Sequence, residues 1–362
     1  MRSAASTDLI PHARRLFLAA LALCLAALSV GVACAARASD VQNEGEAQEA
    51  RAWLMRIHEA VGRRNFQGTF VVTAGGSVAS ARILHFCDGR NQYERIDSLD
   101  GQARQVLRHN DLVHTLWPAS KTAVIERRQA MNEFPALLQS GDDRIVDYYD
   151  VRAQGTDRVA GHEADVLSLH PRDAYRFGYR LWAERRSGLL LRAEVLDENG
   201  NVLEASAFSD VVIGIKSQPE LVLSAMKRLD GYRVQRQLLE PTELEREGWA
   251  MRQAPPGFRL VSTVRRPLDD SSTPHPASQS APPSTQPVLQ SIYSDGLTYV
   301  SVFIEPFNSA VHRREFLMAL DATRTMTRRS GDWWITVIGD VPSATLRAFV
   351  SGLERQTLNS KR

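Results

Sequence analysis

The sequence predicts an α+β protein with two domains, the first of them rich in antiparallel β-strands. Short β-prone segments recur along most of the chain, and dipeptides such as Asn199–Gly200 and Asp295–Gly296 separate them as turns do in a meander. Amphipathic segments at 47–62 and after Pro342 are the clearest helices. The chain has 362 residues, which is more than one hydrophobic core usually organises.

Residues 1–38 have the pattern of a secretory signal peptide. Arginines precede an uncharged run from Leu16 to Ala36, and small residues around Ala38 suit a cleavage site. We expect cleavage after Ala38 and export. Two alternatives stay open, because the run is nearly long enough to be retained as a membrane anchor and because Cys34 could carry a lipid, although its upstream sequence is unusual for that modification.

Charge and cysteine content limit the partners of the exported chain. Residues 1–38 hold four Arg and one Asp, so cleavage reduces 44 basic and 42 acidic residues to 40 and 41, a net charge of −1. This balance, without a basic stripe, argues against nucleic-acid binding. Cys87 is then the one remaining cysteine and fits a half-buried structural thiol at the end of a strand. A disulfide to another chain is the alternative.

The first domain is expected over residues 45–217. Its helix at 47–62 places apolar side chains at helical spacing, and these need a sheet to cover. Regularly spaced strands predict a curved sheet or open barrel, interrupted by an irregular or helical segment near 133–139. The expected strands cover 66–73, 78–87, 92–99, 102–109, 112–117, 121–126, 175–183, 189–195 and 202–212.

A smaller α+β domain is expected over residues 236–362, after an interdomain linker at 218–235 that has few β-signals and several charges. The linker could hold a short helix after Pro219. The second domain contains the hairpin around Asp295–Gly296 and ends in the helix after Pro342. Residues 267–287 consist mainly of Ser, Pro, Thr, Ala and Gln, which predicts a disordered insert.

The sequence carries no motif of a common enzyme. His162–Glu163 opens like a zinc-protease motif, but Val166 stands where the second histidine is required. None of the nine histidines has the spacing of a metal ligand. The adjacent carboxylates of Asp142 and Asp143 are explained by a solvated loop. We therefore expect no enzymatic activity, no metal and no cofactor, with an unusual hydrolase as a distant alternative.

Apolar and aromatic side chains of the first domain suggest a lipid site as a secondary hypothesis. Most of them are expected to form core, but a half-closed sheet would turn some toward a concave pocket suited to acyl chains. The candidate residues for lipid binding are Phe66, Phe70, Leu84, Phe86, Tyr93 and Trp117.

Several sequence blocks follow one another in an order that is typical of one protein family. They are Phe66–Val71, Pro171–Asp173, Tyr175–Tyr179, Ser187–Leu189, Glu198–Gly200, Pro255–Phe258, Tyr293–Leu297, Phe303–Pro306 and Val337–Pro342. Together they resemble the MucB/RseB family, periplasmic regulators of envelope-stress sigma factors of the sigma-E/AlgU type. The resemblance implies an N-terminal LolA/LolB-like half-open antiparallel β-barrel with helices, followed by a smaller C-terminal α+β domain. Leu190 departs from the family, which often has Pro there.

The resemblance implies a periplasmic negative regulator. It would bind the periplasmic segment of a single-pass anti-sigma factor of the MucA/RseA kind and shield it from regulatory proteolysis, and lipid, lipopolysaccharide or mislocalised lipoprotein would release it. A periplasmic lipid or lipoprotein carrier of the LolA/LolB type is the alternative, and a homo-oligomer stays open. Candidates for the anti-sigma surface, which core packing would also explain, are Tyr293, Leu297, Tyr299, Phe303, Glu305 and Trp334.

Overall fold

The computed structural model describes residue 45 and residues 48–127, 134, 144–236, 239–266 and 287–356. The expected signal peptide, the pair Asp142–Asp143, the segment 133–139 apart from Phe134, and the insert up to residue 286 lie outside these ranges. The chain divides into a short unit ending at Ala52 and a main unit from Trp53 onwards. No helix within the described ranges is long and apolar enough to span a membrane.

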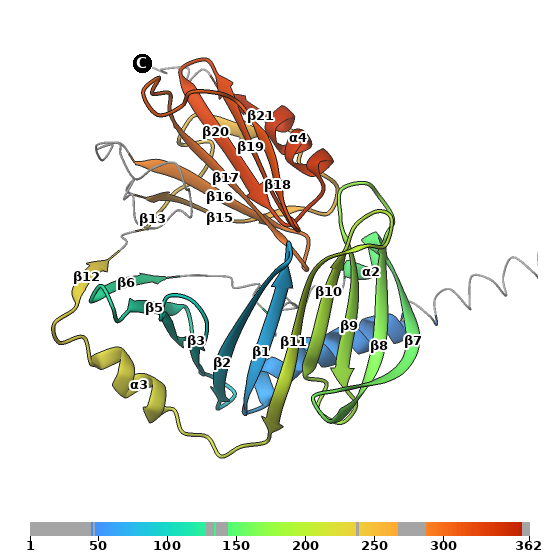
Figure 1. Ribbon diagram of the computed structural model, residues 1–362. Coiled ribbons are helices and arrows are strands. Elements are labelled where there is room, and N and C mark those ends of the chain that lie inside the picture. Colours follow the sequence, from blue (N-terminus) through green and yellow to red (C-terminus); the bar gives the residue numbers. More distant parts are fainter. Residues whose placement is uncertain are drawn as a thin grey trace, which may run out of the picture. The chain divides into compact units, whose positions relative to one another are not determined.

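A large, mostly antiparallel sheet forms the first domain. Its strands are β1 (Phe66–Ala74), β2 (Ser77–Cys87), β3 (Gln92–Ser98), β4 (Gln105–His109), β5 (Leu112–Trp117), β6 (Thr122–Arg127), β7 (Tyr149–Val159), β8 (His162–Pro171), β9 (Gly178–Glu184), β10 (Leu190–Leu196), β11 (Val202–Ile213) and β12 (Arg233–Arg236). The 12 strands follow the order β12-β6-β5-β4-β3-β2-β1-β11-β10-β9-β8-β7 (Figure 1). The two ends of this order are not paired with each other, so the barrel is open.

Side chains alternate between the two faces of this sheet, as the two-residue period of a strand requires. Phe66 and Phe70 share one face with their cross-strand neighbours on β2 and β11, and we call it the cavity face. Leu107 lies on the opposite face and is fully buried there, beneath the helix α3 (Glu220–Lys227). Both faces of this part of the sheet are therefore covered.

The segment expected to be a linker, 218–235, packs on the first sheet instead. Val222 and Met226 of α3 pack against Phe86 and Leu107, and β12 pairs in parallel with β6. The sequence did not reveal this because α3 is a single short helix and two side chains supply its buried contact. Residues 218–235 consequently contribute to the core of the first domain.

Two more differences concern strands of the first domain. β7 and β8 were not among the expected strands. The middle of β7 is exposed and lacks apolar alternation, whereas β8 is largely buried. The strand expected from Tyr175 begins only at Gly178, since the residues before it form a turn. A short helix, α2 (Ile145–Tyr148), leads into β7.

The second domain is a smaller sheet covered on one face by a helix. Its strands are β13 (Glu240–Pro241), β15 (Arg259–Arg266), β16 (Val288–Ser294), β17 (Tyr299–Pro306), β18 (Leu317–Leu320), β19 (Thr323–Ser330) and β20 (Trp333–Gly339), in the order β13-β15-β16-β17-β20-β19-β18. β14 (Trp249–Met251) pairs with β21 (Leu353–Arg355). The helix α4 (Ser343–Gly352) packs Leu346 and Phe349 on Val302 and Val337 of the sheet. The α+β fold class with an open first sheet is confirmed.

The hairpin of β16 and β17 forms as expected, but its turn differs from the prediction. A two-residue Asp-Gly turn would place both residues at positive φ, whereas Gly296 alone does so here, at 102°. The connection runs from Asp295 to Thr298, and Oδ1 of Asp295 accepts hydrogen bonds from the amides of Leu297 and Thr298, each at 3.0 Å. The aspartate thus stabilises the turn through its side chain.

Candidate functional site

A cavity of about 540 Å³ is lined by residues of both domains. The first sheet contributes apolar side chains of its cavity face, such as Phe70, Ile96 and Val106. The second domain contributes the turn after β16 and the start of β17, including Leu297 and Tyr299. The volume falls within the roughly 300–1,000 Å³ of ordinary ligand pockets. An apolar wall of this kind suits hydrocarbon.

Charged groups also reach the cavity. Glu204 of β11 and Asp340 after β20 both line it. Burial raises the pKa of Glu204 to about 7, and the nearby carboxylates of Asp340 and Asp321 act in the same direction. The exposed Arg104 supplies a positive charge elsewhere in the lining. The cavity therefore has apolar walls and carries the carboxyl groups of Glu204 and Asp340 where the second domain meets it.

The six lipid candidates do not form one site. Phe70 lines the cavity. Phe66 lies on the same face but is fully buried, with its ring stacked on His85 at 4.8 Å. The remaining candidates lie elsewhere: Leu84, Phe86 and Tyr93 on the opposite face with α3, and Trp117 half-buried at the end of β5. The prediction missed most of the residues that line the cavity. The two-residue period of β1, which places Phe70 and Val72 on one face, and the cross-strand pairing of that face were the available signal for them.

The buried His85 has a structural environment. Its Nδ1 lies 3.2 Å from Oε2 of Glu94, and its Nε2 lies 2.8 Å from the carbonyl oxygen of Val61. Burial opposes protonation, but hydrogen bonds with Cys87, Glu94 and the Val61 carbonyl, together with the negative charge of Glu94, raise the pKa of His85 to about 9. The hydrogen bond from Nε2 to Val61 ties the end of the preceding helix to the sheet, and the contact with Glu94 joins β2 to β3. In the part of the chain that the structure describes, no group of three or more His, Cys, Asp or Glu side chains could hold a metal ion.

The anti-sigma candidates divide between core and surface. Tyr293 belongs to the core, because its ring packs against Phe349 at 4.9 Å. Leu297 is buried in the cavity wall. The other four lie on the face of the sheet opposite α4, which we call the open face; they are Tyr299, Phe303, Glu305 and Trp334.

The open face is partly covered near Trp334. The ring of His312 stacks on Trp334 at 4.8 Å with an interplanar angle of 7°, and Nε2 of His312 lies 3.4 Å from Oε1 of Glu305. Trp334 is only 6% exposed as a result, so it supports the loop that carries His312. Tyr299 and Phe303 are half-buried and continue this face toward the cavity.

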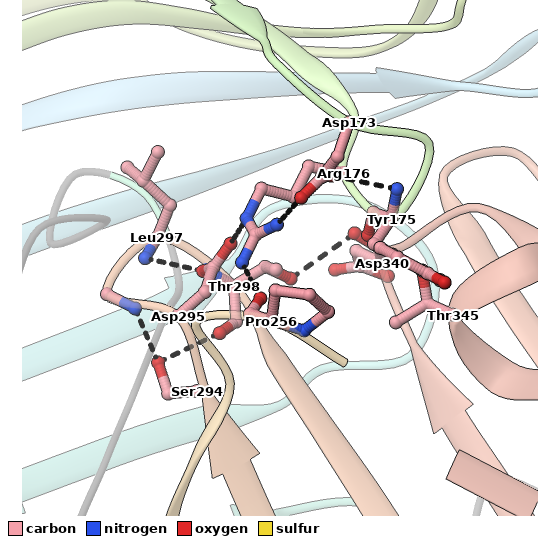
Figure 2. Close-up of polar contacts among 11 residues, drawn as sticks. Asp173, Tyr175, Arg176, Pro256, Ser294, Asp295, Leu297, Thr298, Asp340 and Thr345 are labelled. Carbon is pink, nitrogen blue, oxygen red and sulfur yellow. Dashed lines mark hydrogen bonds and ion pairs between the residues drawn. The ribbon is translucent and has the colours of Figure 1, made fainter. Parts of the chain in front are cut away.

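Arg176 forms a polar cluster that the sequence did not predict (Figure 2). Its Nε donates to Oδ2 of Asp295 at 2.8 Å, and its terminal nitrogens donate to the carboxylate of Asp173 and the carbonyl oxygen of Pro256. The guanidinium centre lies 4.4 Å from the ring centre of Tyr148 and 5.1 Å from that of Phe258. The alternation of apolar and polar residues from Tyr175 to Trp182 is typical of a strand with one solvated face and would place Arg176 on that face, whereas its side chain is 0% exposed.

Family models and known proteins match nearly the whole described chain. The model of the MucB/RseB N-terminal domain matches residues 49–229, and that of the MucB/RseB C-terminal domain matches residues 243–354. The sigma factor AlgU regulatory protein MucB of Pseudomonas aeruginosa is 28% identical over 307 residues, 83% of this chain and 89% of that protein. The sigma-E factor regulatory protein RseB of Escherichia coli K12 is 24% identical over 305 residues, 84% of this chain and 90% of that protein.

Solved structures match most of this chain. The structure described as the complex of Pseudomonas aeruginosa MucA and MucB superposes with a TM-score of 0.65 at 26% identity, covering 85% of this chain and 99% of that chain. A crystal structure of MucB superposes with a TM-score of 0.59 at 25% identity, covering 85% and 98%. Both domain models and both kinds of relative agree, so this chain belongs to the MucB/RseB family.

Proposed function

We propose that this protein is a periplasmic negative regulator that binds the periplasmic segment of a membrane-spanning anti-sigma factor and shields that segment from regulatory proteolysis. The observation that carries the proposal is the likeness of both domains to MucB, which has been solved in complex with the periplasmic part of MucA; that structure superposes with a TM-score of 0.62 and is covered over 99% of its length. A carrier of the LolA/LolB type is the competing function, but a carrier has no use for the second domain.

The open face supports a protein partner. Tyr299 and Phe303 present half-buried aromatic rings along one strand, and Glu305 follows on the same face. Aromatic side chains that are partly exposed on a rigid sheet are typical anchors of a protein interface. We propose that the partner segment contacts this face, with Phe303 as an anchor.

Titration calorimetry with the anti-sigma factor's periplasmic segment tests this surface. Phe303→Ser should weaken binding by at least tenfold, since losing a central aromatic anchor typically costs about 2 kcal/mol or more. Val212→Ser is the matched control, because Val212 is 50% exposed on a strand of the first sheet. Equal affinities of the two variants would remove the open face from the proposal, and no binding by the unmodified protein would refute the function itself.

We further propose that an amphiphile in the cavity releases the partner. Apolar walls around Phe70, Ile96 and Val106 would take hydrocarbon, and Arg104 could pair with an anionic head group. Lipid, lipopolysaccharide or the acyl chains of a mislocalised lipoprotein share this chemistry. Release requires that the ligand and the partner favour different states of the protein.

Native mass spectrometry with phosphatidylglycerol tests the cavity. Val195 is half-buried in its wall, so Val195→Trp should fill the space and abolish the lipid adduct. Val212→Trp adds the same bulk on the exposed side of the neighbouring strand and should leave the adduct unchanged. Retention of the adduct by Val195→Trp would place the lipid elsewhere.

A further inference from the structure

The two domains share one buried guanidinium. Figure 2 shows Arg176 with Asp173 of the first domain and with Asp295 and Pro256 of the second. The ring of Tyr148, also of the first domain, lies over the guanidinium. Thr345, in the first turn of α4, adds a hydrogen bond of 2.7 Å from its hydroxyl to the carbonyl oxygen of Tyr175. The contact is therefore a set of directional bonds across the domain boundary.

Arg176 is hard to replace in this position. Its planar guanidinium donates hydrogen bonds to three acceptors, and the ring faces of Tyr148 and Phe258 lie against it. A lysine ammonium does not reproduce this combination. The side chains of Arg176 and Asp295 are both 0% exposed. Separating the domains would break the ion pair between Arg176 and Asp295, leaving Arg176 with Asp173 and Asp295 without its guanidinium partner until water entered. A buried charge that loses its partner is strongly unfavourable.

The same aspartate shapes the cavity wall. Oδ2 of Asp295 binds Arg176, while Oδ1 accepts from the amides of Leu297 and Thr298. Leu297 and Thr298 line the cavity. A displacement of this wall is consequently transmitted through one carboxylate to the bond that joins the domains.

Because Asp295 binds both Arg176 and the turn that lines the cavity, we infer that Arg176 is an interdomain latch. It holds the second domain against the first and keeps the turn Asp295–Thr298 in place as the wall of the cavity. Gly257 fits this role, because a side chain there would collide with the ring of Tyr148 at 2.7 Å and with the guanidinium itself. The inference concerns domain docking and does not depend on which partner the protein binds.

Small-angle X-ray scattering and calorimetric unfolding of the mature chain test the latch. Arg176→Ala should raise the radius of gyration and split the unfolding profile into two transitions, one for each domain. Arg152→Ala is the matched control, because Arg152 pairs with Asp150 within β7 and its side chain is 64% exposed. The control should keep the scattering curve and the single transition of the unmodified protein.

Asp295→Asn provides a second, milder variant, since the amide oxygen can still accept from Leu297 and Thr298 while the ion pair is lost. It should shift the radius of gyration in the same direction as Arg176→Ala. If Arg176→Ala proves unfolded by circular dichroism, Asp295→Asn and Arg176→Lys decide the question. The latch is refuted if the folded variants scatter and unfold as Arg152→Ala does.

Discussion

Replacing Gly257 by alanine gives a direct test of how tightly the Arg176 cluster is packed. Gly257 has φ +81, and an added Cβ would meet Tyr148 ring carbons at 2.7 Å and come closer still to Nη2 of Arg176. The guanidinium is held by three acceptors and does not move aside easily. Left-handed backbone costs alanine about 1 kcal/mol, and overpacking adds about 1–3 kcal/mol. We expect a total loss of about 2–4 kcal/mol.

Gly200→Ala isolates the backbone contribution. Gly200 has the same φ of +81, but nothing lies within 4 Å of its added Cβ. Its alanine variant should therefore lose only about 1 kcal/mol. Urea unfolding of both variants, followed by circular dichroism, gives the difference directly. If the two variants lie within about 0.5 kcal/mol of each other, the packing argument around Arg176 is wrong.

Three further predictions concern buried polar groups. Tyr293→Phe should leave stability unchanged or raise it by up to about 1 kcal/mol in urea unfolding, because the Tyr293 hydroxyl has no hydrogen-bond partner in the described structure. Since the pKa of Glu204 rises to about 7 in the folded state, stability should fall by about 1–2 kcal/mol as pH rises from 4.5 to 7, and Glu204→Gln should abolish that slope in a series of thermal melts. The raised pKa of His85, about 9, predicts a stabilisation that is complete below pH 6.5 and lost as pH rises through 9; Glu94→Gln should cost about 3 kcal/mol at pH 6 and flatten this profile in chemical denaturation.

Local patterns predicted most of the fold. The turn dipeptides marked hairpins that the structure contains, and the apolar stripe after Pro342 is the buried face of α4. β7 was missed because its exposed middle carries no alternation, and α3 was missed as core because its burial depends on strands far away in the sequence. The periodic spacing of apolar residues predicts burial only where a whole helix or strand is amphipathic.

The site was less predictable than the fold. Phe70 and Phe86 look alike as aromatic residues of neighbouring strands, but register places them on opposite faces. Arg176 stands in an alternating run whose other polar members suggest solvent, and only the approach of Asp295 and Pro256 buries it. Family membership confirms a regulatory binding protein and not an enzyme.

The rate at which the regulatory protease cuts the anti-sigma factor tests the central proposal most directly. The anti-sigma factor's periplasmic segment would be incubated with its protease in the presence and absence of an equimolar amount of the mature chain. We predict that cleavage slows in proportion to the fraction of segment bound, and that it recovers when phosphatidylglycerol fills the cavity. Cleavage at the same rate under saturating complex formation would contradict the proposed shielding.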